Sequence, residues 1–517
     1  MNPSSGTPPA SSTEAPEAQT ESRRRADERA SVIEMSPSVW NGTFLPHYFG
    51  CFTRADFHAQ FDTDFNNLHL TRGTRRSYIA PRGGAKSTWN TLAHPLRAAL
   101  EAWEPYTLIL SDSSEQANQH LGHIRKEIEE NEIIQSVYGH DAEIGSTWRS
   151  SRLTLRNGSI IEALGTGKKI RGRRNRSARP SLIVLDDIQS NADVASPTLR
   201  KRAWDWVTRE VIPAGDERTN FLAVGSAIHR EAVSVRIGQL AGWTGRIFKA
   251  VHSWPIRMDL WTEFERLATN LTDDHRGDTA KRFYEQHKAE MDHGAETYWP
   301  ERWPLVELMM LRATVGHSAF ESEYQGVPGT LSGAEWPAEL FDRPDLWFDA
   351  WPNDIVVKVQ SLDPSKGATD KSDYQGHIML GLSRFGTLYV DCELRREPNW
   401  VERCVDLAGY FRPNVLVAES NNTMGLLAPE LQRILRERQA QGRGFNLQWT
   451  ERIHTLPKLV RVRTLTPYLT ARNIKFRNTA GGRMLVDQLR DVPLGDHDDG
   501  PDALGTAIIH LQEMVGR

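Results

Sequence analysis

A glycine-containing turn carries the first residues whose types and spacing could do chemistry. It reads Ala80, Pro81, Arg82, Gly83, Gly84, Ala85, Lys86, Ser87 and Thr88. A loop that binds nucleotide phosphates needs a flexible backbone, a lysine for the outer phosphates and a hydroxyl for magnesium, ahead of a helix. Lys86 and Ser87 supply the last two groups, and Arg82 could stabilise charge at the γ-phosphate. The usual pattern has glycine in place of Ala80 and Ala85, so the turn alone fits a phosphate loop and a plain glycine turn equally.

Two adjacent carboxylates end an apolar segment further along the chain. The segment is 182–185, and Asp186 and Asp187 follow it. Sites in parallel sheets form at strand ends, where Asp186 would hold magnesium and Asp187 would act as general base toward the attacking water. A buried strand before a helix-capping aspartate is the better explanation of this run taken alone. Its position after Lys86 and Ser87 favours a nucleotide hydrolase.

Two further segments of this first part have an open interpretation. The apolar segment 221–224 ends in Gly225-Ser226-Ala227, which could sense the γ-phosphate or be an ordinary core strand and turn. A basic, glycine-rich stretch at 165–174 continues to Arg176 and Arg179. It is either a solvated loop or a contact to phosphate backbone or another subunit.

The last third of the chain carries carboxylates at the ends of three segments. Asp363 follows the apolar segment 356–362, and Glu419 follows the apolar segment 414–418. A helix-like segment near the C-terminus opens with a third acidic group, Asp498, Asp499 and Asp502. Two strand-end carboxylates and a helix-start carboxylate can meet around two divalent ions, which activate water for phosphodiester hydrolysis. Each acid could instead begin a turn or cap a helix. The order Asp, Glu, Asp on strand, strand and helix favours a nuclease, with the third carboxylate left open.

The elements that must position these residues alternate between strand and helix. In the first part the pattern predicts a mostly parallel sheet with both faces covered. Its expected strands are 77–81, 106–111, 182–185 and 221–224, with a hairpin at 153–163 and helices at 87–103, 113–131 and 204–211. Glycine and proline punctuate 315–354, where we place the domain connection. Three consecutive strands are expected next, at 355–362, 376–383 and 386–393.

Length and composition set the domain number and exclude several classes of protein. The chain has 517 residues, of which 39% are hydrophobic and 25% charged, which is typical of two globular domains. We predict a disordered tail at 1–34, an ATPase domain at 35–325, a linker at 326–353 and a nuclease domain at 354–517. A formal charge of -4 excludes a uniformly basic nucleic-acid binder. Three separated cysteines give no disulfide or zinc pattern, and no apolar run suits a membrane helix.

Taken in order, these motifs resemble the large terminase subunit of tailed bacteriophages, a DNA-packaging ATPase-nuclease. The resemblance covers the chain from about Met35 to its end. The residues that carry it are Arg82, Gly83, Lys86 and Ser87, then Ile170-Arg171-Gly172, then Arg179-Pro180 leading to Leu185-Asp186-Asp187, then Tyr324-Gln325 with Pro328, and finally Asp363, Glu419, Asp498-Asp499 and Asp502-Ala503-Leu504.

The resemblance implies an α/β fold in two parts, an ASCE-type P-loop NTPase followed by an RNase H-like mixed α/β nuclease domain. It also implies that ATP hydrolysis drives double-stranded DNA through the portal protein of a procapsid, and that a two-metal endonuclease with Mg²⁺ or Mn²⁺ cuts concatemeric DNA. The expected assembly is a homo-oligomeric ring on the portal, which a small terminase subunit loads with DNA in the host cytoplasm. The chain is not expected in the mature virion or at a membrane.

Residue roles follow from the same resemblance. Lys86 and Ser87 would bind phosphates and magnesium, Asp186 would support that metal and Asp187 would be the base, although the family usually has Glu there. Gly225-Ser226-Ala227 would couple hydrolysis to movement. The nuclease metals would bind Asp363, Glu419 and one or both of Asp499 and Asp502.

Two other classes of protein remain as alternatives. One is a repair-type ATPase-nuclease or helicase, which would be expected to carry a second ATPase-like domain. The other is a DNA-binding scaffold with decayed sites. An arginine acting on a neighbouring subunit is also open, with candidates Arg72, Arg75, Arg76, Arg173 and Arg174.

Overall fold

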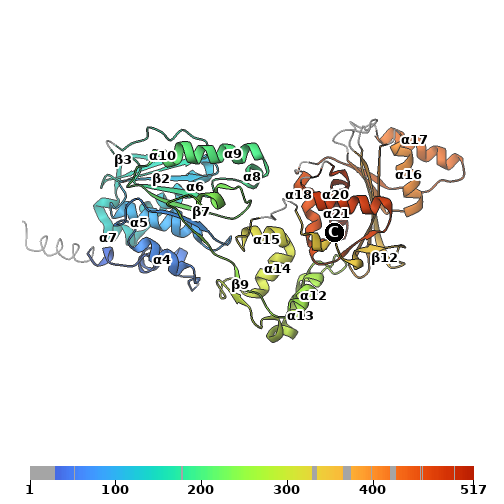
Figure 1. Ribbon diagram of the computed structural model, residues 1–517, viewed down its shortest axis with the longest axis horizontal. Coiled ribbons are helices and arrows are strands. Elements are labelled where there is room, and N and C mark those ends of the chain that lie inside the picture. The colour runs from blue at the N-terminus through green and yellow to red at the C-terminus, as the bar shows by residue number, and fades with distance from the viewer. Residues whose placement is uncertain are drawn as a thin grey trace, which may run out of the picture. The chain divides into compact units, whose positions relative to one another are not determined.

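The computed structural model describes residues 30–51, 53–175, 178–328, 335–364, 374–396, 399–419, 427–454, 456, 458–493, 495 and 497–516. The chain forms two compact units, Met1–Phe248 and Lys249–Arg517 (Figure 1). Of the predicted tail, residues 1–29 lie outside the described residues, and residues 30–33 are helical.

The first unit is built on an eight-stranded sheet with the order β3-β4-β5-β2-β6-β7-β1-β8. The strands from β5 to β8 in this order pair in parallel, and β3, β4 and β5 pair antiparallel. β7 lies between β1, which precedes the glycine turn, and β6, which ends at Asp186. This inserted strand is the ASCE-type order, so the predicted fold class of this unit is confirmed. The bounds are β1 Arg75–Ile79, β2 Tyr106–Ser111, β3 Ile144–Arg149, β4 Arg152–Leu155, β5 Ile160–Gly165, β6 Leu182–Asp186, β7 Asn220–Gly225 and β8 Thr244–Ile247.

Helices cover both faces of this sheet. Their bounds are α2 Pro37–Phe44, α3 Pro46–Phe49, α4 His58–Asn66, α5 His94–Leu100, α6 Ser114–Glu130, α7 Glu132–Tyr138, α8 Asn191–Ala195, α9 Pro197–Trp206, α10 Ile212–Ala214 and α11 Val233–Ile237. Successive residues of a strand point to opposite faces. Accordingly, Ile109 of β2 packs with α5 and α6, while Leu108 and Leu110 pack with α9 and α11 on the other face.

The helix predicted at 87–103 differs in detail. It begins as a π-helix, Thr88–Ala93, and continues as α5. Pro95, which we expected to bend it, is the second residue of α5, which directly follows the π-helical turns. The predicted helix 113–131 is confirmed as α6, and its capping residue Ser113 accepts a hydrogen bond from the backbone N–H of Gln116.

The second unit contains a seven-stranded sheet with the order β11-β17-β14-β13-β12-β15-β16. The antiparallel strands β12, β13 and β14 are followed by β15, which returns parallel to β12. Three antiparallel strands with a parallel strand beside the first is the RNase H-like order, which confirms the predicted fold class. The bounds are β11 Trp347–Phe348, β12 Ile355–Asp363, β13 Gln375–Ser383, β14 Leu388–Arg395, β15 Val415–Glu419, β16 Trp449–Arg452 and β17 Ile474–Arg477.

Two pairs of helices enclose this sheet. Figure 1 shows α20 and α21 on one side of it and α16 and α17 on the other, each pair facing its own apolar core. The helix bounds in this part are α16 Trp400–Phe411, α17 Leu427–Ala440, α18 Lys458–Val462, α19 Thr466–Thr470, α20 Ala480–Asp491 and α21 Asp499–Val515.

The boundary between the units differs from the predicted linker at 326–353. A helical segment, assigned from sequence to the ATPase domain, belongs to the second unit; its helices are α12 Met258–Ala268, α13 Arg276–Met291, α14 Leu305–Val315 and α15 His317–Glu323, with the short strands β9 Val251–Ser253 and β10 Glu296–Thr297. The Asn473 side chain donates to the Arg266 carbonyl and the Thr269 hydroxyl of this segment, at 3.1 and 3.0 Å. Trp336, inside the predicted linker, is buried and donates to Thr466 Oγ1 at 3.0 Å. The described residues 335–353, which include three of the prolines, therefore form a packed segment of short elements. No helix among the described residues is long and apolar enough to cross a membrane.

Candidate active sites

The glycine turn follows the carboxyl end of β1, where a nucleotide site would form. Gly83 has φ +73°, and a Cβ at Gly84 would lie 2.9 Å from the Pro81 carbonyl oxygen. The two internal glycines are thus required by the backbone path. Ala85 also has a positive φ, +60°, which an L-residue adopts at an energetic cost. The alanine at this position of the pattern therefore sits in a conformation that glycine would adopt freely.

Asp186 at the end of β6 is aimed at the start of the helix after the turn. Ser87 Oγ donates to Asp186 Oδ1 at 3.0 Å, and Thr91 Oγ1 donates to Asp186 Oδ2 at 2.6 Å. Burial, and then the nearby charge of Asp187, raise the pKa of Asp186. The structure therefore brings together the hydroxyl and carboxylate that the sequence assigned to magnesium. Thr91, which sequence reasoning missed, lies in the π-helical turn, and its spacing from Ser87 gave no separate signal.

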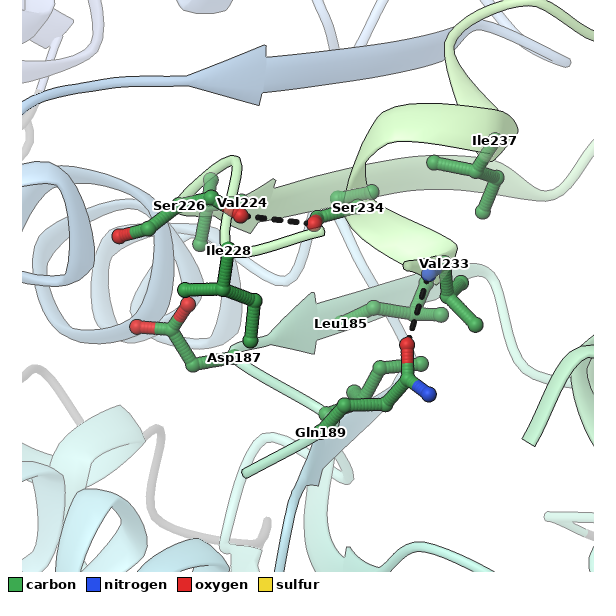
Figure 2. Close-up of a pocket in the computed structure, with 11 residues that line it drawn as sticks. Leu185, Asp187, Gln189, Val224, Ser226, Ile228, Val233, Ser234 and Ile237 are labelled. Carbon is green, nitrogen blue, oxygen red and sulfur yellow. Dashed lines mark hydrogen bonds between the residues drawn. The ribbon is translucent and has the colours of Figure 1, made fainter. Parts of the chain in front are cut away.

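Lys86, Asp187 and Ser226 meet beside that pair. Lys86 Nζ donates to Ser226 Oγ at 3.3 Å and lies 3.8 Å from Asp187 Oδ2. Figure 2 shows the Asp187 and Ser226 side chains extending to the same side of the pocket that they line. Asp187 has φ +43°, a left-handed conformation that aspartate tolerates better than most residues. These distances fit a phosphate-binding lysine between a proton acceptor and a strand-end hydroxyl.

The segment 225–227 is also tied to a helix. Ser234 Oγ donates to the Ser226 carbonyl at 2.8 Å, and the Val233 N–H donates to Gln189 Oε1 at 2.7 Å, as Figure 2 shows. A Cβ at Gly225 would lie 2.8 Å from Ser234 Cβ, so only glycine allows this approach. The end of β7 therefore contacts both Lys86 and the start of α11.

His58 of α4 forms a hydrogen bond to the glycine turn, and the sequence analysis did not identify it as part of the site. The Ala55 N–H donates to its Nδ1 at 3.2 Å, so Nε2 carries the proton and donates to the Gly84 carbonyl at 2.9 Å. Burial lowers the pKa of His58 to about 4, which keeps the ring neutral at physiological pH. The only sequence signal is a histidine beside Phe57, a pair common in apolar cores.

Most of the candidate arginines have structural partners. Arg72 makes two hydrogen bonds to Glu104, at 2.7 and 3.0 Å, and Arg173 pairs with Glu162. Arg76 lies 3.6 Å from Asp64, and Arg75 lies over the Phe221 ring. Arg174 is exposed and has no ion pair within the part of the chain that is described. Arg82 is also exposed.

Three carboxylates of the second unit converge as the sequence predicted. One oxygen each of Asp363, Glu419 and Asp502 lies within 4.8 Å of the others. β12 and β15 are parallel neighbours with Leu362 opposite Ala418, so Asp363 and Glu419 leave the sheet side by side. Burial, then Glu419 and Asp502, raise the pKa of Asp363 to about 8. Burial also raises the pKa of Glu419. Crowded carboxylate oxygens are the donor set that a hard divalent cation requires, so these residues fit such an ion.

The packing of α21 selects among the three acids that open it. Asp502 joins Asp363 and Glu419, whereas Asp499 Oδ2 accepts the Tyr374 N–H at 2.9 Å. Asp498 lies 2.7 Å from Lys458. Of the predicted ligands, the structure therefore gathers Asp363, Glu419 and Asp502, and it places Asp499 at the side of that group.

A glycine of β13 allows α21 to reach the sheet. A Cβ at Gly376 would lie 3.0 Å from Ala503 Cβ and 3.1 Å from the Asp499 carbonyl oxygen. Gly376 is directly opposite Asp363 in the β12–β13 pair. In addition, Ser361 Oγ of β12 donates a hydrogen bond to the Ala503 carbonyl of α21 at 2.6 Å. The helix and strand carboxylates meet because the helix backbone approaches at this point.

Two cations beside the carboxylates were missed in the sequence. Arg461 Nε donates to Asp502 Oδ1 at 2.7 Å, its Nη2 bonds Asp502 Oδ2, and Nη2 lies 4.0 Å from Glu419 Oε2. Lys458 Nζ lies 3.7 Å from Asp499 and 3.8 Å from Asp502. Both belong to α18, where a lysine and an arginine three residues apart look like any solvated helix face. They offset part of the repulsion in the cluster.

Comparisons with known proteins give likenesses to solved structures. No family model and no curated protein matches this chain. The large terminase of a thermophilic bacteriophage is 9% identical, with 89% of this chain and 99% of that chain covered and a TM-score of 0.41. The HK97 bacteriophage large terminase is 13% identical, with 95% and 99% covered and a TM-score of 0.31. The human cytomegalovirus terminase nuclease domain is 15% identical, with 31% and 86% covered and a TM-score of 0.25. The likeness is one of fold, to structures that include large terminases, the family that the motifs of this chain resemble.

Proposed function

We propose that this chain is the motor subunit of a viral DNA-packaging machine. ATP hydrolysis at Lys86 and Asp187 drives double-stranded DNA into a procapsid, and a metal-dependent endonuclease at Asp363 cuts concatemeric DNA. One observation carries the proposal: a single chain holds two constellations of chemically suited side chains, each at the carboxyl ends of neighbouring parallel strands in its own sheet. A motor that must both move and cut a phosphodiester chain needs both.

In the first unit, each side chain has a part in phosphoryl transfer. Lys86 reaches the outer phosphates of ATP, and Ser87 with Asp186 holds Mg²⁺, which would neutralise charge developing on them. Asp187 orients the attacking water and accepts its proton. Ser226 contacts Lys86 on one side and α11 through Ser234 on the other, so loss of the γ-phosphate can be passed to that helix.

In the second unit, Asp363, Glu419 and Asp502 hold divalent metal, Mg²⁺ or Mn²⁺, which would activate water and steady the leaving oxygen. Arg461 fixes both oxygens of Asp502, so its carboxylate keeps its direction toward Asp363. Lys458 adds a positive charge at the edge of the cluster, where a DNA phosphate would approach.

The assembly is part of the proposal. We infer a homo-oligomeric ring on the portal protein, loaded with DNA by a small terminase subunit in the host cytoplasm and absent from the mature virion. The runner-up, a repair-type ATPase-nuclease or helicase, would turn over ATP equally well without capsids. ATP turnover that rises when DNA and portal-bearing procapsids are added supports packaging.

The first test uses two single variants, Lys86→Ala and Asp363→Ala. Lys86→Ala should abolish ATP hydrolysis and spare DNA cleavage, because the lysine touches only the nucleotide site. Asp363→Ala should abolish cleavage in Mg²⁺ or Mn²⁺ and spare ATP hydrolysis and DNA binding. The measurements are phosphate release and gel-based cleavage of plasmid DNA.

Exposed residues of the same types provide controls, Lys126→Ala and Asp278→Ala, which should leave both activities unchanged. If each site variant loses both activities while it stays folded, the division of labour is wrong. If Asp363→Ala cleaves normally, the carboxylate cluster is not a nuclease site.

A further inference from the structure

A basic pocket lies at the amino ends of the strands in the first unit. Its lining includes Pro105, just before β2, and Ser181, just before β6. The glycine turn and Asp186 lie at the carboxyl ends of the same sheet. A five-residue strand such as β6 spans about 16 Å at roughly 3.3 Å per residue, so the pocket and the nucleotide site occupy opposite edges.

The charge of this amino-edge pocket is strongly positive. Four arginines line it, Arg72, Arg174, Arg179 and Arg218, together with one acid, Asp216. Glu104 offsets Arg72, but Arg174, Arg179 and Arg218 form no ion pair within the described residues. Asp216 already accepts the Arg218 N–H at 2.9 Å and the Thr219 hydroxyl at 3.2 Å. A net positive charge therefore remains for an external anion.

Two of these guanidinium groups are held in fixed directions. Arg72 Nη2 donates to the Ser181 carbonyl at 3.0 Å as well as to Glu104. Arg179 Nη1 donates to the carbonyls of Pro213 and Gly215, at 2.9 and 3.0 Å. Carbonyl partners orient a guanidinium without removing its charge. Both terminal nitrogens of Arg72 already bond Glu104, so of the two it is the held guanidinium of Arg179 that suits phosphate oxygens.

The aromatic residues of the pocket are already engaged. Trp103 stacks on His69 with ring centroids 4.0 Å apart, and Arg97 lies 4.8 Å from the Trp103 ring. Burial, and then Arg97 and Arg72, lower the pKa of His69, so the ring is neutral at pH 7. With its faces contacted in this way, Trp103 is a poor platform for a nucleobase or an anchor for a protein partner. Recognition in this pocket rests on charge.

We infer that the amino-edge pocket binds the phosphate backbone of duplex DNA, so the first unit holds DNA at the edge opposite its nucleotide. The inference rests on the proposed function, which makes duplex DNA the substrate. Contacts to phosphates carry no sequence information, as translocation of any sequence requires. This inference assigns different roles to arginines of the basic stretch that begins at 165. Arg173 pairs with Glu162 within the unit, whereas Arg174 and Arg179 line the pocket and would contact DNA.

The test uses the full chain carrying Arg174→Ala and Arg218→Ala together. Fluorescence anisotropy with a short random-sequence duplex measures Kd over a series of salt concentrations. We expect weaker binding, and a slope of log Kd against log salt that falls by about 1.8, at about 0.9 for each phosphate that is no longer neutralised. The corresponding pair of lysine substitutions, which keeps the charge, should retain most of the slope.

A matched control replaces Arg156 and Arg209, two arginines of the same unit that have acidic partners. It should bind DNA like the unchanged protein. Affinity for a fluorescent ATP analogue should be the same in all variants, because the nucleotide site lies at the other edge.

Two results would overturn the inference. In one, the double alanine variant keeps the Kd and the salt slope of the unchanged protein. In the other, it changes the sedimentation of the protein and not its DNA binding, which would make the pocket a contact between copies of this chain. Neither result touches the proposed function, which has its own tests in the Lys86 and Asp363 variants and in the response of ATP turnover to procapsids.

Discussion

Single residues beside the glycine turn show how much its conformation depends on neighbouring side chains. The Gly84 carbonyl is a buried acceptor, and His58 satisfies it. The Phe57 ring lies 3.1 Å from the position that a Gly84 Cβ would occupy. His58 and Phe57 thus fix the position of Gly84, two residues before Lys86.

Substitutions at His58 test this role. His58→Leu leaves the Gly84 carbonyl unpaired, at a cost of about 1–3 kcal/mol, and should raise KM for ATP about fivefold or more. His58→Gln keeps an amide donor and should restore most of the affinity. Steady-state ATP hydrolysis at several ATP concentrations separates KM from kcat. Equal impairment of both variants would show that ring packing, and not the hydrogen bond, supports the loop.

The same histidine predicts a pH effect on stability. The pKa of His58 in the fold is about 4, below its unfolded value of about 6.5. The folded state therefore binds fewer protons, and the chain loses stability as pH falls from about 6.5 toward 4. His58→Gln should lose less stability over that range, as measured by thermal unfolding at a series of pH values.

Sequence could identify Lys86, Ser87, Asp186, Asp363 and Glu419 because each stands at the end of an apolar strand or in a short local pattern. It could not choose among Asp498, Asp499 and Asp502. Each residue of a helix turns its side chain by about 100°, so the choice depends on how α21 docks on the sheet. Lys458 and Arg461 were missed for the same reason, since only tertiary packing brings α18 to the carboxylates.

At the scale of elements, the contact between α18 and α21 fixes one member of the carboxylate cluster, Asp502. Arg461 and Asp502 form a buried pair with two hydrogen bonds. Removing one partner of such a pair leaves an uncompensated buried charge. The two helices therefore stabilise the fold and the candidate metal site through the same side chains.

A double-mutant cycle measures this contact. In metal-free protein, Arg461→Ala should destabilise the second unit by about 3 kcal/mol or more. Adding Asp502→Ala to it should cost less than the sum of the single effects, because the stranded carboxylate is gone. Arg452→Ala, which breaks a more exposed pair with Glu513, should cost about 0–1 kcal/mol. Thermal unfolding followed by circular dichroism gives the values, and strictly additive effects would contradict the coupling.

Elements were predictable where hydrophobic periodicity was strong. The strands β2, β6, β7 and β12 to β14 follow the expected segments closely. The packing of 335–353 was not predictable, because prolines indicate irregular backbone whether or not that backbone is packed. Trp336, Phe341 and Leu346 are buried there, and their burial depends on partners far along the chain.

At the scale of the whole molecule, the two units separate the candidate nucleotide site from the carboxylate cluster. Each has its own sheet and its own apolar cores. Ligands that bind only the folded site slow local opening of that site. A nucleotide and a divalent ion should therefore slow amide hydrogen exchange in different segments of the chain.

A magnesium complex of a non-hydrolysable ATP analogue should slow exchange at 80–91 and 186–188. Mn²⁺ alone should slow exchange at 374–377 and 499–503, where Tyr374 and α21 meet the carboxylates. Lys86→Ala should remove the first effect only, and Asp363→Ala the second only. Mass spectrometry of peptides from each range reads the result, and a metal effect that survives Asp363→Ala would place the ion elsewhere.

Gly376 has no side chain to offer a ligand, yet it affects the spacing of the three candidate metal ligands. Because Gly376 has no Cβ, α21 can pack closely against β13. The distance between this helix and this strand affects how far Asp502 lies from Asp363 and Glu419. Divalent ions differ by only a few tenths of an ångström in their preferred bond lengths to oxygen. We therefore expect the missing methyl group of Gly376 to influence which ion the three carboxylates prefer, although a search for reactive residues passes over this position.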